Sequence, residues 1–150
     1  MTRMLTLDTP TVADYPALMA LWEASVRATH DFLPEPYLLI LRDHVLPKYL
    51  PAVTLVGCKD QAGRFLGFAG VAQQRLDMLF VAPAYHGQGI GTRLLSHAVE
   101  ALGVRTLDVN EQNPRALGFY RRQGFEVTGR AETDGLGQPY PLLHLRLIDR

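Results

Sequence analysis

Cysteine is almost absent from this chain of 150 residues, because Cys58 is the only one. A single cysteine excludes internal disulfides and a metal site built from several cysteines. Cys58 lies in the apolar run from Val53 to Lys59, so we expect a buried packing residue rather than a reactive thiol. His44, His97 and His144 show no metal-ligand spacing with other residues, and we therefore predict no metal.

The chain also lacks net charge, since 15 basic and 15 acidic side chains balance, and nothing indicates a nucleic-acid partner. No apolar stretch approaches the roughly 20 residues of a membrane span. The N-terminus has no apolar signal segment. We therefore expect a cytoplasmic protein that does not bind membranes. A chain of 150 residues can bury a single core, so we predict one domain over residues 1–150.

What the chain does have is a glycine-spaced turn between a strand and a helix. The apolar run Met78–Val81 ends before Pro83, and glycines follow at positions 87, 89 and 91. Without Cβ atoms, the backbone N–H groups of such a turn can converge on an anion at the positive end of the next helix. The turn therefore predicts a pyrophosphate site.

Two common phosphate motifs fit this turn poorly. A P-loop needs a lysine after its last glycine, but Gly91 is followed by Thr92 and Arg93. The dinucleotide fingerprint needs a further glycine where this chain has Thr92 or Leu94. Asp108 does lie at about the spacing of roughly 20 residues expected for its acidic partner, so a nucleotide-binding module stays an alternative.

A second block follows the predicted strand Thr106–Asn110. Asn113 is a favourable helix N-cap, and Pro114 suits the first helical position. Gly124 suits the position just past the end of that helix. The block therefore predicts a short, well-delimited helix.

Together, the two blocks resemble those of the GNAT superfamily of N-acetyltransferases. The first block matches at Val81, Pro83, Gly89 and Gly91, with the common extra glycine at Gly87, whereas His86 stands where arginine or glutamine is usual. The second block matches at Asn113, Ala116, Phe119, Tyr120, Gly124 and Phe125. The segment Thr29-His30-Asp31-Phe32 is similar to a Thr-His-x-Phe pattern of one bacterial GNAT subfamily.

Hydrophobic periodicity and turn residues predict the order β-αα-βββ-α-β-α-ββ. The predicted strands are Met4–Leu7, Val53–Lys59, Phe65–Ala72, Arg75–Val81, Thr106–Asn110, Phe125–Glu132 and Leu142–Ile148. The predicted helices end near Thr29, run from Tyr37 to Leu46 after a loop broken by Pro34 and Pro36, and follow the two motif turns. The resemblance implies the GNAT fold of the α/β class (α+β mixed), with about seven strands in a mixed central sheet and about four helices on its two faces.

The resemblance also implies acetyl-coenzyme A as co-substrate. The residues implied for its binding are Leu79, Phe80, Val81, His86, Gly87, Gln88, Gly89, Gly91, Thr92, Asn113, Ala116 and Tyr120. A bulge expected at Leu79–Val81 would free a backbone N–H for the oxyanion. Arg121 and Arg122 could contact a phosphate of the coenzyme or form a solvated helix face.

Acetyl transfer to an amine also needs an acid and a base. The resemblance assigns the acid to Tyr120, with the alternative that its ring only packs against the sheet. His30, Glu111 and Asp77 are the candidate bases, and an ordered water could replace them. His30, Phe32 and Tyr140 are the candidate acceptor-binding residues.

We therefore predict an N-acetyltransferase that moves acetyl from acetyl-coenzyme A to a primary amine by direct attack in a ternary complex. The acceptor is left open between a small metabolite, an antibiotic amine, a peptide N-terminus and a protein lysine. A non-catalytic acyl-coenzyme A sensor is the alternative. Exposed edge strands would allow a homodimer.

Overall fold

A computed structural model describes residues 4–148, so the ends of the predicted domain, residues 1–3 and 149–150, lie outside the described residues. The strands are β1 (Thr6–Asp8), β2 (Thr54–Lys59), β3 (Phe65–Ala72), β4 (Arg75–Val81), β5 (Thr106–Asn110), β6 (Phe125–Ala131) and β7 (Leu142–Leu147). The α-helices are α1 (Tyr15–Thr29), α2 (Glu35–Ile40), α3 (Leu46–Tyr49), α4 (Ile90–Leu102) and α5 (Pro114–Arg122). The predicted order of elements is confirmed, except that the predicted second helix is divided into α2 and α3.

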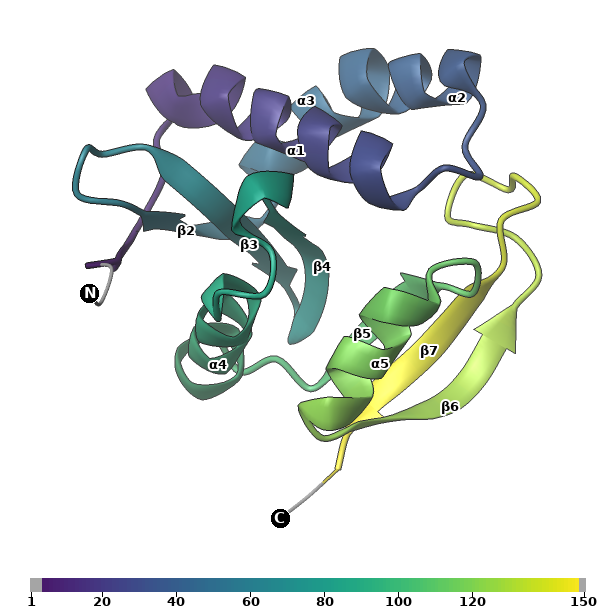
Figure 1. The fold of residues 1–150 in the computed structure, drawn as a ribbon. Helices are drawn as coiled ribbons and strands as arrows, with labels where there is room; N and C mark the ends of the chain where they lie inside the picture. Colours follow the sequence, from purple (N-terminus) through teal and green to yellow (C-terminus); the bar gives the residue numbers. More distant parts are fainter. Residues whose placement is uncertain (1–3, 149–150) are drawn as a thin grey trace.

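The seven strands form one mixed sheet in the order β1-β2-β3-β4-β5-β7-β6. All neighbouring strands are antiparallel except β4 and β5, which are parallel. The helices cover both faces of this sheet (Figure 1), with α1, α2 and α3 on one face and α4 and α5 on the other. The predicted mixed sheet with helices on both faces is therefore confirmed.

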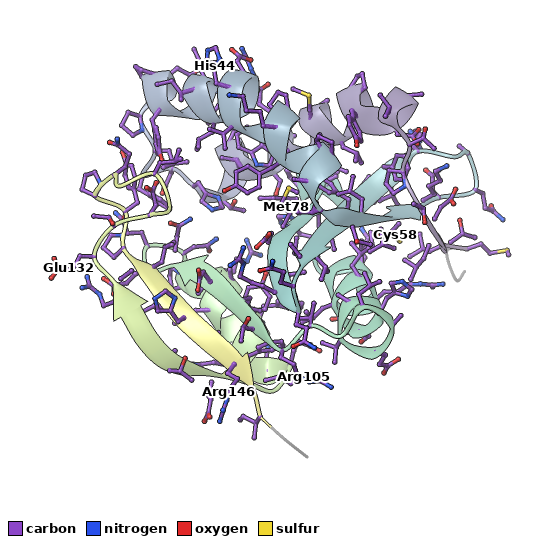
Figure 2. The ribbon with its side chains drawn as sticks, turned by 180° about the vertical axis from the view of Figure 1, so that it is seen from behind. His44, Cys58, Met78, Arg105, Glu132 and Arg146 are labelled. Carbon is purple, nitrogen blue, oxygen red and sulfur yellow. The ribbon has the colours of Figure 1, made fainter. Side chains whose placement is uncertain are left out.

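Each face of the sheet has its own apolar core. Leu18, Trp22 and Met78 belong to the core beneath α1, and Figure 2 shows Met78 close to this helix. Leu94 and Leu107 belong to the core beneath α4 and α5. Cys58 also lies in this second core with 0% exposure, which confirms the prediction of a buried cysteine.

The helical segment after α1 differs from its prediction. The helix begins at Glu35 rather than Tyr37, because Pro36 sits in the first turn, where a missing N–H costs nothing. It then passes through a π-helical turn at Leu41–Val45 before α3. Pro47 in the first turn of α3 cannot donate a hydrogen bond to the preceding turn, which accounts for the irregular stretch.

Strands β4 and β5 pair only at their beginnings, where Arg75 faces Thr106 and Leu76 faces Leu107. Beyond Leu76 the two strands separate. The bulge in β4 lies at this point, since Gly70 pairs with Met78 and Val71 with Leu76, leaving Asp77 unpaired. The bulge predicted at Leu79–Val81 is therefore wrong in position, because those residues continue a regular ladder with β3. The sheet is therefore splayed between β4 and β5 beyond Leu76.

Candidate active site

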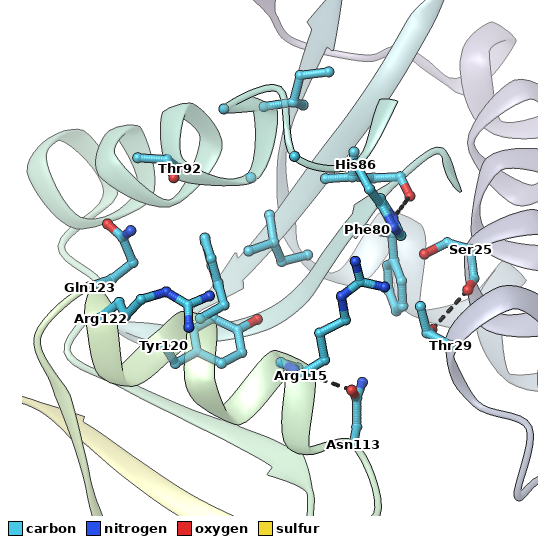
Figure 3. Close-up of a pocket in the computed structure, with 18 of the residues that line it drawn as sticks. Ser25, Thr29, Phe80, His86, Thr92, Asn113, Arg115, Tyr120, Arg122 and Gln123 are labelled. Atoms are coloured by element: carbon cyan, nitrogen blue, oxygen red, sulfur yellow. Dashed lines mark hydrogen bonds between the residues drawn. The ribbon is translucent and has the colours of Figure 1, made fainter. Parts of the chain in front are cut away.

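A cavity of about 490 Å³ lies where β4 and β5 separate, between α1, α4 and α5. Its walls include eleven of the twelve residues predicted to bind the coenzyme: Leu79, Phe80, Val81, His86, Gly87, Gly89, Gly91, Thr92, Asn113, Ala116 and Tyr120. Gln88 does not line it. We call this space the coenzyme cavity, and Figure 3 shows it between the α4 and α5 helices.

Residues that the sequence reasoning missed also line the coenzyme cavity, namely Ser25, Thr29, Ile90, Arg115, Phe119 and Gln123. Of the two arginines considered for a phosphate, Arg122 lines the cavity and Arg121 does not. Figure 3 shows Arg115 extending from α5 toward Phe80, across the cavity. Two guanidinium groups, those of Arg115 and Arg122, therefore line this cavity.

The glycine turn has the conformation that its spacing predicts. Gly87 and Gly89 have φ values of 77° and 83°, in the left-handed region that favours glycine. A Cβ atom added at either position would meet nothing within 4 Å, so the space above the turn is open. Gly89 is the N-cap of α4, whose first N–H groups have no partner inside the helix. This open cradle of N–H groups, with Arg115 and Arg122 nearby, fits the pyrophosphate of coenzyme A.

The side chain of His86, an unusual residue at this position of the motif, makes a hydrogen bond that the sequence did not predict. Its Nε2 lies 2.9 Å from the carbonyl oxygen of Val81, and because a carbonyl only accepts, the imidazole N–H donates. The side chain therefore ties the glycine turn to the end of β4. Arginine or glutamine could donate in a similar way, so the substitution leaves the cradle intact.

The end of β4 presents free backbone groups to the coenzyme cavity. Ala82 donates its N–H to the carbonyl oxygen of Leu66 on β3 at 2.9 Å. Since bonded and non-bonded pairs alternate along an antiparallel ladder, the N–H groups of Leu79 and Val81 point away from β3. They face the gap that opens where β5 no longer pairs with β4.

Tyr120 enters the cavity from α5 with only 9% of its surface exposed. Its ring packs edge-on against Phe119 and Phe125, with centroids 5.2 and 6.1 Å away. Figure 3 shows its hydroxyl pointing into the cavity, where it has no hydrogen-bond partner among residues 4–148. Burial raises the pKa of this phenol well above its ordinary value, so it holds its proton firmly.

His30 caps the C-terminal end of α1 and lines two cavities at once. Its Nδ1 lies 2.7 Å from Oγ1 of Thr29, and this hydroxyl in turn donates to the carbonyl of Ser25 at 2.8 Å. Nε2 makes no hydrogen bond to any residue that the structure describes. Burial lowers the pKa of His30 below its ordinary 6.5, although the nearby charge of Asp31 opposes this shift, so the imidazole is neutral at pH 7.

The second cavity, of about 450 Å³, lies on the other side of His30, and we call it the acceptor cavity. His30 and Phe80 line both cavities, so the two spaces share a wall. Trp22 and Leu46 contribute to the apolar part of the lining. The lining holds one basic side chain, Arg75, and three acidic ones, Asp77, Asp108 and Asp134, so acidic side chains are in excess.

A row of aromatic rings connects His30 to the loop between β6 and β7. His30 contacts Phe32 at 5.4 Å between ring centroids, and Phe32 contacts Tyr140 at 6.0 Å. Tyr140 stacks on Tyr37 of α2 at 5.3 Å, and the hydroxyl of Tyr37 donates a short hydrogen bond to Asp134. The structure thus brings together His30, Phe32 and Tyr140, the three predicted acceptor-binding residues, although Phe32 supports the wall from behind and is not part of the lining.

The other two candidate bases lie apart from the junction of the cavities. Glu111 lines neither cavity and forms an ion pair with Arg130, with atoms 2.5 Å apart. The hydrogen bond from Arg130 lowers the pKa of this carboxyl. Asp77 lines the acceptor cavity but is paired with Arg75 at 2.5 Å. His30 is therefore the candidate base whose accepting atom is free of such a partner.

Among residues 4–148, no group of three or more His, Cys, Asp or Glu side chains could hold a metal ion. Figure 2 shows His44 on the helical layer, away from the sheet. No helix within the same described range is long and apolar enough to cross a membrane.

We compared the chain with protein-family models and with known proteins. The model of the acetyltransferase (GNAT) domain matches residues 52–127, which include β4, the glycine turn and α5. The peptidyl-lysine N-acetyltransferase YjaB of Salmonella typhimurium is 44% identical over 128 residues, which are 85% of this chain and 88% of that protein.

Solved structures agree with the fold. The solution structure of apo-form YjaB from Escherichia coli has a TM-score of 0.89 at 39% identity, covering 98% of this chain and 99% of that one. The PaiA N-acetyltransferase of Thermoplasma acidophilum, solved in complex with coenzyme A, has a TM-score of 0.73 at 19% identity, covering 97% and 99%. The second likeness concerns the fold alone.

Proposed function

This chain belongs to the GNAT family of N-acetyltransferases, which use acetyl-coenzyme A, and we propose that its acceptor is the side-chain amine of a lysine in a peptide or protein. The name of the YjaB relatives, peptidyl-lysine N-acetyltransferase, supports this acceptor. The acceptor cavity supports it as well. A lysine has a long apolar stem and a cationic end, and the cavity combines an apolar lining with excess negative charge.

The observation that carries the proposal is the position of His30 on the wall shared by the two cavities. A lysine ammonium with a pKa of ~10.4 is mostly protonated at pH 7, which costs about 4 to 5 kcal/mol before its nitrogen can attack. The apolar part of the acceptor cavity reduces this cost by disfavouring the charged form. His30, neutral through burial, then takes the proton that the nitrogen loses as its bond to the acetyl carbon forms.

Two further groups complete the proposed direct transfer. The thioester of acetyl-coenzyme A supplies an activated acyl group. The N–H groups of Leu79 and Val81 point into the gap beside β4 and can donate to the oxygen that becomes negative during the attack. Collapse of the tetrahedral species breaks the carbon–sulfur bond, and Tyr120 donates a hydrogen bond to the leaving thiolate. Because burial raises its phenol pKa, Tyr120 stabilises the thiolate mainly as a hydrogen-bond donor.

The proposed cofactor site is the coenzyme cavity itself. Its glycine cradle and the guanidinium groups of Arg115 and Arg122 carry positive potential, whereas the acceptor cavity carries negative charge. An anionic coenzyme and a cationic acceptor would therefore be attracted to different sides of His30. A cytoplasmic location, a single domain over residues 1–150, the absence of a metal and a homodimer stay predictions.

The proposal is tested with purified protein, acetyl-coenzyme A and a lysine peptide whose N-terminus is blocked. Thiol release is measured for the wild type, for His30→Gln and for His44→Gln, in which the histidine is exposed and lines neither cavity. We expect His30→Gln to lower kcat by about 100-fold or more, the size of a general-base contribution, and His44→Gln to leave it unchanged. Binding of acetyl-coenzyme A without any thiol release from the wild type would instead support the sensor alternative.

A further inference from the structure

The hydroxyl of Thr29 lies between two hydrogen-bonding partners, and only one arrangement of protons satisfies both. Oγ1 is 2.8 Å from the carbonyl oxygen of Ser25 and 2.7 Å from Nδ1 of His30. A carbonyl oxygen carries no proton, so the single proton of the hydroxyl belongs to the contact with Ser25. The contact with His30 then needs its proton from the imidazole, and Nδ1 must be the protonated nitrogen.

We propose that Thr29 is a positioning residue that holds His30 in the tautomer with its proton on Nδ1 and its lone pair on Nε2. This inference rests on the proposed role of His30 as the base, since a base needs a lone pair directed at the acceptor. The other tautomer would present an N–H donor from Nε2, which cannot accept a proton. A neutral histidine is assigned to one tautomer by the hydrogen bond of its other nitrogen.

The surroundings of His30 fix its ring as well as its tautomer. The backbone N–H of His30 donates to the backbone carbonyl of Val26 at 2.7 Å. The backbone carbonyl of His30 accepts from the backbone N–H of Leu33 at 3.1 Å, so the backbone is held on both sides. Phe32 packs against the ring, with centroids 5.4 Å apart. Thr29 supplies the one side-chain hydrogen bond to this imidazole within residues 4–148. Its hydroxyl therefore decides which nitrogen is left to accept.

The chain offers a matched pair of substitutions for a test. Thr29→Val keeps the shape and the branching of the side chain and removes only the hydroxyl. Thr29→Ser keeps the hydroxyl and loses a methyl group. Both leave the backbone N–H of Thr29 in the helix, so the fold is expected to survive in each, and thermal melting checks this.

The experiment reads the tautomer directly. Histidine labelled with ¹⁵N is introduced into the wild type and both variants. The signals of His30 are assigned by their absence from His30→Gln. At a pH above the imidazole pKa, the ¹⁵N chemical shifts then show which of its two nitrogens carries the proton. We expect Nδ1–H in the wild type and in Thr29→Ser, and loss of that preference in Thr29→Val. In Thr29→Val, kcat should fall by about 10- to 100-fold, by analogy with the loss of a partner that orients a metal-bound histidine.

A wild type with its proton on Nε2, or Thr29→Val with the same tautomer and kcat as the wild type, would overturn the inference. The failure of the proposed function has a different signature, because it would appear as full activity of His30→Gln. In that case the tautomer measurement would still report whether Thr29 fixes the ring.

Discussion

Replacing Gly89 by alanine separates the role of the glycine turn in coenzyme binding from its role in folding. Gly89 has a φ of 83°, and an added Cβ would meet nothing within 4 Å. The cost to stability is therefore conformational, because no atom must move. An alanine in the left-handed region costs about 1 to 2 kcal/mol. The stiffer unfolded chain offsets about 0.4 to 1 kcal/mol of this cost, leaving roughly 1 kcal/mol.

Gly63 provides the matched control, since it has a φ of 81° and also has nothing within 4 Å of an added Cβ. It lies in the hairpin turn between β2 and β3 and lines neither cavity. Gly63→Ala and Gly89→Ala should therefore lose similar stability, with Tm lowered by about 2 to 4 °C each for a chain of this size. Differential scanning calorimetry measures both.

The two variants should differ in their affinity for acetyl-coenzyme A. The Cβ of Gly89→Ala would project into the open space where we expect the pyrophosphate, whereas that of Gly63→Ala would project into solvent. We expect isothermal titration to give a Kd raised by about 10-fold or more, or about 1.4 kcal/mol, for Gly89→Ala alone. Equal affinities for the two variants would refute the assignment of the turn as the phosphate cradle.

Three further predictions concern the remaining parts of the site. Tyr120→Phe should lower kcat by about 10- to 100-fold. The KM for acetyl-coenzyme A and Tm should change little, because the Tyr120 hydroxyl has no hydrogen-bond partner among the described residues. Unchanged turnover would leave this ring a packing role only. In the pH profile, kcat should fall on the acidic side with a midpoint below 6.5. Burial lowers the pKa of His30, and protonation removes the lone pair that accepts the proton. If the same acidic fall in kcat persists in His30→Gln, His30 is excluded as its cause. Tyr37→Phe should raise the KM for a lysine peptide by several-fold, because it removes the hydrogen bond to Asp134 that holds the β6–β7 loop against α2. An equal rise in the KM for acetyl-coenzyme A would contradict a role confined to the acceptor cavity.

Local signals explain why the coenzyme cavity could be predicted largely from sequence. The helix bounds Ile90–Leu102 and Pro114–Arg122 follow from glycines, a proline and the cap Asn113, whose side chain accepts the N–H of Ala116. Such features act within a few residues of themselves, so a single sequence displays them. The cradle and Tyr120 lie on these two blocks.

Features that depend on packing between distant segments could not be predicted in the same way. Tyr37 and Asp134 are 97 positions apart, and nothing in either segment indicates that they meet. Ser25 and Thr29 line the coenzyme cavity only because α1 packs against β4. The available signal for this position was a serine among the apolar residues of a buried helix face. Ser25 has 4% exposure there. Likewise, Asp77 within an apolar strand was the available signal for the true position of the bulge.

The identity of the acetylated nitrogen tests the central claim most directly. A peptide with a free N-terminal amine and one internal lysine is incubated with the purified protein and acetyl-coenzyme A, and fragment-ion mass spectrometry locates the acetyl group. We predict acetylation of the lysine side chain, in amounts that depend on the protein and are lost in His30→Gln. Acetylation of the N-terminal amine alone, or no acetylation of any lysine peptide, would contradict it.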